Sequence, residues 1–462
     1  MISLIILSLV GLFIMLSGLI NVSNIIATIV CIAALTCSAA LFILDWNTML
    51  IYYNDMLFFD NYALSFSILL CIITIFVFLA SKFYFHDVLQ YANEHLALFI
   101  FSLTGMIMIV AFDHLSMLFI GIEVMSIPLY ILAGSRKKSL SSNEASLKYF
   151  LMGAFATGLL LMGITLVYGE TGSFHVQKIA ESVSNLDTAT QSPLLILGIA
   201  FLLAGMGFKI SAVPFHFWTP DVYQGAPTLV TMFMSTAVKI AGFASFYRLL
   251  TYCFMQAGEV WAPIISVIAL LTISVGSITA MYQTSAKRML AYSSISHAGY
   301  MLLLFLSTDT TSANLLLYYA FAYAFSSIVA FSVIEAVQKT VGNDEFEAFN
   351  GLAKLNPLTA LFMTVAMISM AGIPITGGFF AKFYALSTGI DSGYMWIVIP
   401  AIINAIIGVY YYFKIIIAMY FKEKNVHTND LEINTFQNIV LIKCTIITLL
   451  LGLFPDFVFY LF

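Results

Sequence analysis

The sequence predicts an all-α membrane protein of about 14 transmembrane helices, with two inverted five-helix repeats (helices 4–8 and 9–13) in which helices 7 and 12 are broken. The first observation is composition: of 462 residues, 61% are hydrophobic and only 9% are charged. A soluble domain carries roughly 25% charged residues, so this chain requires lipid around it. The second observation is a series of long apolar stretches, and the third is a pair of buried lysines that lie beside prolines.

A spanning helix needs about 20 apolar residues, because the hydrocarbon core is roughly 30 Å thick. Fourteen stretches meet this requirement, near 2–20, 25–44, 60–80, 96–112, 115–133, 149–168, 193–213, 227–249, 262–282, 290–306, 313–336, 358–388, 396–420 and 437–460. The first has no basic segment or cleavage site, so we interpret it as a mature helix rather than a signal peptide. The five cysteines lie in apolar runs without metal-ligand spacing. The chain has no basic tract of the kind that would indicate nucleic-acid binding.

The distribution of Lys and Arg predicts the orientation, because these residues stay on the cytoplasmic side. With the N-terminus outside, only Lys178 and Arg248 fall in outside loops or at outside helix ends. Both termini are therefore expected outside. The inside loops then hold Lys82, Arg136, Lys137, Lys138, Lys148, Lys287, Arg288, Lys339, Lys354, Lys422 and Lys424.

Charged groups in the middle of spanning helices are the strongest functional candidates, because each costs about 2.5–3.5 kcal/mol at membrane depth. Glu123 shares a helix face with Ser126 and Tyr130, which indicates a hydrated path or a structural pair with a neighbouring helix. Lys209 precedes Pro214, and a broken helix is tolerated only where it lines a cavity or is buried in protein.

Three further groups belong to this set. Lys239 lies on a stripe of small and hydroxyl side chains, and its mid-helix position favours an interior role over reaching the membrane surface. His297 lies among serines and a tyrosine. Its near-neutral pKa suits a proton relay, although a lone histidine is more often a satisfied core residue. Lys382 follows a second break at Pro374.

Weaker candidates lie nearer the helix ends. Lys414 is some eight residues from the cytoplasmic end of its helix, and Lys148 begins another helix. Either side chain could be a solvated charge at the membrane surface. We interpret Asp113 and His114 mainly as residues of a tight turn.

The two breaks indicate the inverted repeat. Helices 7 and 12 are an odd number apart and therefore cross the membrane in opposite directions. Lys209 precedes its proline, whereas Lys382 follows its own, as inversion requires. The predicted organisation is N-terminal helices 1–3 (1–94), a first repeat (95–250), a second repeat (251–424) and a C-terminal helix (425–462).

Three motifs carry a family resemblance. The stretches PFHFWTPDVYQGAPTLV (214–230) and KRMLAYSSISHAGY (287–300) resemble the antiporter-like subunits of proton-pumping NADH:quinone oxidoreductase, respiratory complex I. NEASLKYFLMGAFATG (143–158) is most similar to the N-type of the three paralogues. The M-type typically has glutamate where this chain has Lys382, and the L-type is much longer. Lys414 stands where the family often has arginine.

The resemblance implies a proton-translocating membrane subunit that uses Glu123, Lys209, Lys239 and Lys382, with His297 as a relay. It implies no cofactor in this chain, with NADH, FMN, Fe–S clusters and quinone bound by partner subunits. M-type and small K-type subunits would be its neighbours in a bacterial inner membrane. Two alternatives remain: a subunit of a multi-subunit sodium/proton antiporter or hydrogenase-type complex, and a scaffold without a proton path.

Overall fold

Helices dominate the chain, because only a helix or a closed barrel satisfies its own backbone hydrogen bonds within lipid. The computed structural model describes residues 1–20, 22–81, 84, 91–185, 192–307, 310–423, 431, 433–456 and 458. Within these ranges, 11 helices are long and apolar enough to cross a membrane. The expectation of a multi-pass helical membrane protein is therefore confirmed. Lys82 and Lys424 lie outside the described residues.

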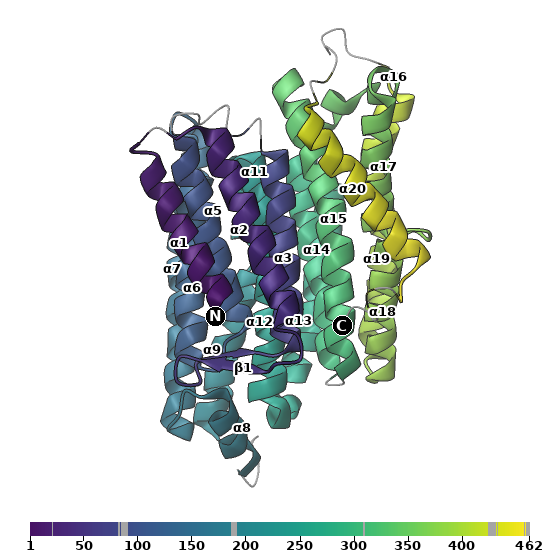
Figure 1. The fold of residues 1–462 in the computed structure, drawn as a ribbon. Coiled ribbons are helices and arrows are strands. Elements are labelled where there is room, and N and C mark those ends of the chain that lie inside the picture. The colour runs from purple at the N-terminus through teal and green to yellow at the C-terminus, as the bar shows by residue number, and fades with distance from the viewer. Residues whose placement is uncertain are drawn as a thin grey trace.

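The helices run roughly side by side along the long axis of the bundle (Figure 1). The elements in chain order are α1 (Ile2–Ser17), α2 (Asn24–Leu44), β1 (Leu50–Tyr52), β2 (Leu57–Phe59), α3 (Asn61–Ala80), α5 (Ala92–Val110), α6 (Leu115–Ala133), α7 (Leu140–Thr171), α8 (Val176–Asn185), α9 (Pro193–Lys209), α10 (Trp218–Gly225), α11 (Thr228–Phe233), η3 (Met234–Val238), α12 (Lys239–Arg248), η4 (Leu249–Cys253), η5 (Met255–Ala257), α13 (Gly258–Met281), α14 (Ala286–Leu303), η6 (Leu304–Leu306), α15 (Thr310–Val341), η7 (Phe346–Phe349), α16 (Leu352–Leu355), α17 (Pro357–Ala371), α18 (Gly377–Asp391), α19 (Met395–Phe421) and α20 (Thr435–Leu453).

The structure corrects several element boundaries. Residues 50–59 form an antiparallel hairpin, so the fold is not purely α-helical. Helix α7 begins at Leu140 rather than near 149, because Ser139 accepts a hydrogen bond from the backbone of Ser142 and caps a polar first turn. Hydropathy cannot detect such a turn. The amphipathic helix α8 was also not expected, because its polar face interrupts any apolar stretch.

The helical structure is interrupted at two places, near Pro214 and near Pro374, where breaks were expected. Helix α9 ends at Lys209, and the chain is helical again only from Trp218, with Pro214 between them. The second interruption separates α17, which ends at Ala371, from α18, which begins at Gly377. Each interruption contains one non-glycine residue with positive φ, Ser211 at 64° and Ile375 at 80°. A β-branched residue rarely adopts that conformation, so the surrounding packing must enforce it.

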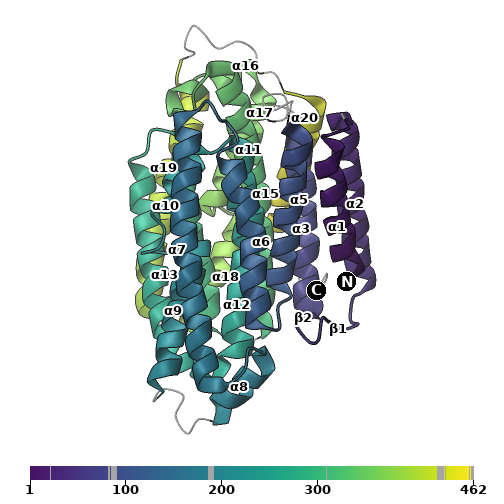
Figure 2. The same ribbon diagram turned by 90° about the vertical axis from the view of Figure 1, so that its left-hand side faces the viewer.

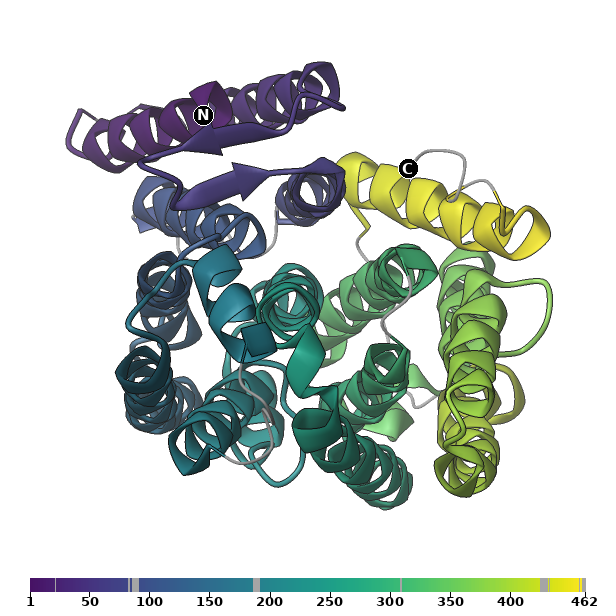
Figure 3. The ribbon, with the colours of Figure 1, turned by 90° about the horizontal axis from the view of Figure 1, so that it is seen from below.

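The order of the helices around the bundle places α12 in its interior. Helices α1 and α2 form an outer layer, and the hairpin lies at the same end of the bundle as α8 (Figures 2 and 3). On the same face of the bundle, α20 runs obliquely and contacts α3, α15, α17 and α18 (Figure 1). Large apolar side chains are exposed on the outside, among them Leu9, Phe155 and Ile406. This outer surface suits lipid or a membrane partner.

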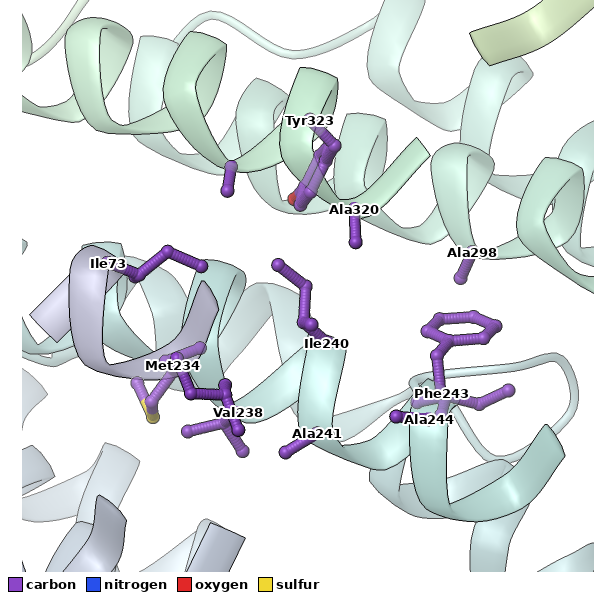
Figure 4. Packing of buried hydrophobic residues seen from close by; sticks show 14 of the residues in the cluster. Ile73, Met234, Val238, Ile240, Ala241, Phe243, Ala244, Ala298, Ala320 and Tyr323 are labelled. Atoms are coloured by element: carbon purple, nitrogen blue, oxygen red, sulfur yellow. The ribbon is translucent and has the colours of Figure 1, made fainter. Parts of the chain in front are cut away.

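The interior around α12 is closely packed and apolar on one side. Figure 4 shows Ile240 and Phe243 of α12 near Ala320 of α15 and Ala298 of α14. Lys239 begins the same helix and is 1% exposed. The apolar packing therefore excludes water from one face of α12. The polar partners of Lys239 must lie on a different face of this helix.

Small residues set the distance between neighbouring helices, so a close-contact glycine is a sensitive position. A Cβ atom on Gly276 of α13 would lie 2.5 Å from the backbone nitrogen of Ser296 on α14. We expect Gly276→Ala to push these helices apart and destabilise the protein by about 1–3 kcal/mol. The measurement is thermal melting in detergent. Gly158→Ala is the matched control, because a Cβ atom at that position would meet no other atom within 4 Å. Equal melting temperatures for the two variants would contradict this packing.

Candidate functional site

Lys209 lies at the end of α9, at the first helix break, and is 5% exposed. Its Nζ donates a hydrogen bond to Ser126 Oγ of α6 at 2.8 Å. A buried ammonium requires such a partner, because burial without compensation is costly. Gly205 lets α9 lie close to α7, since a Cβ atom there would be 2.8 Å from Leu160. The structure therefore assembles this site from three helices.

Glu123 lies on α6, one turn before Ser126, and is half-buried. No ion pair within 4 Å joins Glu123 to Lys209 in the described part of the chain. Glu123 nevertheless lies one helical turn from Ser126, whose hydroxyl accepts the hydrogen bond from Lys209. The two residues therefore share a site in which Ser126, rather than Glu123, makes the direct contact.

Lys239 lies directly after the π-helical turn η3 in the middle of its apolar segment. π-helical turns are rare and are frequent at functional sites. Lys239 Nζ donates to both the carbonyl oxygen and the hydroxyl of Ser294 on α14, at 2.6 and 3.0 Å. Gly242 lies against the backbone of Lys209, since a Cβ atom on this glycine would be 3.9 Å from the Lys209 carbonyl oxygen. The first two lysine sites are therefore adjacent.

His297 is buried on α14, one turn beyond Ser293 and Ser294. Its Nδ1 shares a hydrogen bond of 2.8 Å with the hydroxyl of Tyr319, and its Nε2 shares one of 3.1 Å with the hydroxyl of Tyr412. A cavity of about 10 Å³ lies beside the ring, which is room for about one water molecule. Its lining includes His297, Tyr319, Ser326, Ser369, Gly378 and Ala381.

Lys382 lies on α18, just after the second helix break, and is 7% exposed. Its Nζ donates to the carbonyl oxygen of Ala371, the last residue of α17, at 3.0 Å. It also lies 5.2 Å from the ring centre of Tyr300. Gly372 makes room for the side chain, because a Cβ atom there would be 2.8 Å from Lys382 Cδ.

The weaker candidates have other surroundings. Lys414 is half-buried and donates to the carbonyl of Met281 at the end of α13, a favourable position for a cation at a helix C-terminus. Lys148 has a partly exposed side chain and pairs with Glu144 and Asp221, each at 2.7 Å. Asp221 also pairs with Arg288 at 3.0 Å. Lys148 thus belongs to a surface charge cluster.

The structure also reveals a buried ion pair that the sequence did not indicate. Arg248 was assigned to an outside loop or helix end, but its side chain is fully buried and pairs with Asp60 at 3.0 Å. Asp60 directly follows the hairpin and caps α3 by accepting a hydrogen bond from Ala63. In the sequence, the only feature that could have indicated this ion pair is the acidic Asp60 directly before an apolar stretch. Arg248 lies 188 residues away along the chain, so the pairing needed the fold.

The structure corrects the expected surroundings of one further residue, Lys287, and gives a more specific role to another, His114. Lys287 was expected in a solvated loop, yet it is 2% exposed and donates to the carbonyls of Gln224 and Ala226, where α10 ends. His114 does cap α6, because its Nδ1 accepts a hydrogen bond from the Ser116 backbone. Burial and the neighbouring His175 lower the pKa of His114.

This arrangement of buried lysines, a histidine and broken helices defines an antiporter-like membrane protein. A family model described as "NADH:quinone oxidoreductase/Mrp antiporter, TM" matches residues 112–408. NADH-quinone oxidoreductase subunit N of Cytophaga hutchinsonii is 42% identical over 454 residues, which cover 98% of each chain. The chain belongs to this antiporter-type family and, within it, to the subunit N family of NADH-quinone oxidoreductase.

Solved structures show the same fold. A chain in the structure of respiratory complex I from Thermus thermophilus has a TM-score of 0.85 and 29% identity, and covers 99% of this chain and 98% of its own length. A chain of the Mrp complex from Dietzia has a TM-score of 0.83 and 19% identity, over 97% of this chain and 94% of its own. The latter likeness concerns the fold alone.

The Asp60–Arg248 pair should be important for stability. We expect Asp60→Asn to destabilise the protein by about 3–5 kcal/mol, because it leaves a buried guanidinium without its counter-charge while keeping an N-capping side chain. Thermal melting in detergent measures the effect. Adding Arg248→Met should recover much of the loss, since the unpaired charge is then gone. A single variant as stable as the wild type would show that the pair contributes little.

Proposed function

We propose that this chain translocates protons as a membrane-arm subunit of NADH-quinone oxidoreductase. The observation that carries this function is the set Glu123, Lys209, Lys239, His297 and Lys382. These are ionisable groups on five helices of the bundle. The three lysines and the histidine are almost completely buried, and each has a hydroxyl or carbonyl partner. Charge inside a membrane protein is costly, and such groups mark ion and proton pathways. The sequences named subunit N support the assignment to this complex.

The proposed mechanism couples charge movement to proton transfer. While Glu123 lies near Lys209, its negative charge favours the protonated amine. If Glu123 moves away, the buried ammonium loses that compensation and its release of a proton becomes more favourable. The proton passes to Lys239, whose α12 lies against the end of α9, and then through His297 to Lys382. The electrons flow from NADH to quinone in partner subunits, which hold FMN and the Fe–S clusters.

The proposed architecture comprises fourteen spans and two inverted repeats. Three shorter apolar helices, α1, α9 and α17, join the 11 long candidates among the described residues. Two of these three end at the helix breaks. Lys209 precedes its break and Lys382 follows its own, which supports the inverted relation of 95–250 and 251–424. Helices α1 to α3 and α20 then lie outside the repeats.

The proposed setting is a bacterial inner membrane with both termini outside. The positive-inside distribution supports this orientation, since Arg136, Lys339 and Lys354 follow or precede spans on the side expected to be cytoplasmic. M-type and small K-type subunits are the proposed neighbours. The exposed apolar outer faces provide surfaces of the required chemistry.

The central test is NADH-driven acidification of inverted membrane vesicles. We expect Lys209→Ala to abolish ΔpH formation, or to lower it about tenfold or more, in the assembled complex. NADH oxidation by an artificial acceptor should be unaffected, because that chemistry lies in other subunits. Pumping at the wild-type rate would refute the proposal and favour a scaffold. Sodium-dependent exchange without any response to NADH in wild-type vesicles would instead indicate a cation antiporter.

A milder variant tests the geometry of the first site. Ser126→Ala removes the hydroxyl that accepts the hydrogen bond from Lys209, and an unmet buried donor costs about 1–3 kcal/mol. We expect the pumping rate to fall several-fold, but by less than in Lys209→Ala. Ser102→Ala is the matched control, since its buried hydroxyl donates to the Met125 carbonyl on the same helix, α6. An equal decline in both variants would argue that Ser126 has only a packing role.

A further inference from the structure

The histidine site contains three hydroxyl groups that the proposed pathway has not yet used. His297 is contacted through one ring nitrogen by Tyr319 of α15 and through the other by Tyr412 of α19. The Tyr412 hydroxyl also shares a hydrogen bond with Ser293 Oγ of α14. All four side chains are almost completely buried. Three helices therefore meet in one uninterrupted chain of hydrogen bonds.

The chemistry of imidazole gives this chain a direction. In neutral histidine one nitrogen carries a proton and donates, whereas the other accepts. One tyrosine must therefore donate to His297 and the other must accept from it. Moving one proton along the chain exchanges these roles and leaves no group charged. A satisfied structural histidine needs no third hydroxyl beyond its two partners, yet here Ser293 extends the chain.

The two ends of the chain lie next to the segments that carry the two lysine sites. Ser293 is next in sequence to Ser294, whose carbonyl and hydroxyl accept hydrogen bonds from Lys239. At the other end, Tyr319 lines the small cavity together with Gly378 and Ala381 of α18. Ala381 directly precedes Lys382. The hydroxyl chain thus lies between the α14 segment that holds Lys239 and the α18 segment that carries Lys382.

We propose that Tyr412 is a proton-relay residue between Lys239 and Lys382, with Tyr319 as the relay on the far side of His297. This rests on the proposed function and identifies additional groups for it. A proton released by Lys239 enters at Ser293, and the Ser293 hydroxyl passes its own to Tyr412. Tyr412 gives its hydroxyl proton to Nε2, and Nδ1 gives its proton to the Tyr319 oxygen. Tyr319 passes its original proton toward Lys382, so each relay group keeps its proton count.

The test compares three Tyr→Phe variants in the assembled complex. Tyr412→Phe and Tyr319→Phe each remove one relay hydroxyl and keep the ring. We expect either change to lower NADH-driven ΔpH formation about tenfold. Tyr318→Phe is the matched control, because Tyr318 is the buried neighbour of Tyr319 and its hydroxyl donates to the Leu451 carbonyl at 2.8 Å. Its pumping should stay near the wild-type rate.

The outcomes separate the relay from the pathway as a whole. Wild-type pumping by Tyr412→Phe, while Lys209→Ala fails to pump, would overturn the relay and leave the proposed function intact. Wild-type pumping by Lys209→Ala would overturn both. An equal decline in Tyr318→Phe would assign the effect to packing and overturn the relay.

A second measurement keeps the proposal testable if the Tyr412→Phe variant fails to assemble into the complex. A fluorinated tyrosine at position 412 keeps the ring and the hydroxyl but is a stronger acid. A relay requires the pH profile of the pumping rate to shift, whereas a hydroxyl that only holds its neighbours in place leaves the profile unchanged. An unchanged profile would overturn the proposal.

Discussion

The cost of placing charge within a membrane is the constraint on which the rest of this structure depends. Lys209, Lys239 and Lys382 are almost wholly buried, and each requires an acceptor where no bulk water is available. The acceptors come from neighbouring helices: a hydroxyl for the first, a carbonyl and a hydroxyl for the second, and a carbonyl for the third. The lysines therefore connect neighbouring helices.

The helix interruptions provide part of what the buried charges need. A helix that stops leaves its last carbonyl groups without intrahelical partners. Ala371 ends α17, and its carbonyl accepts the hydrogen bond from Lys382. Lys239 follows a π-helical turn and Lys209 is the last residue of α9. Irregular backbone, a strained residue such as Ile375 and buried lysines thus occur together at the candidate site.

Much of the candidate site could be predicted from residue type and position. Glu123, Lys209, Lys239, His297 and Lys382 are rare ionisable residues in apolar stretches, and burial of the three lysines and the histidine is what the structure shows. The errors concern residues near helix ends. Arg248 and Lys287 were assigned to the membrane surface, but the bundle encloses both. The position of a residue in the sequence indicates how deep it lies along its own helix. It does not reveal whether a neighbouring helix covers the end of that helix.

The sequence by itself determined the membrane-spanning helices, the positions of the interruptions and the small set of charges that lipid cannot tolerate. These features are local, because hydropathy and proline act within one segment of chain. Only the tertiary structure decided the partners: Ser126 for Lys209, Asp60 for Arg248, and Tyr319 with Tyr412 for His297. Such pairings join residues far apart in sequence, and they depend on the packing of helix against helix, which no single helix encodes.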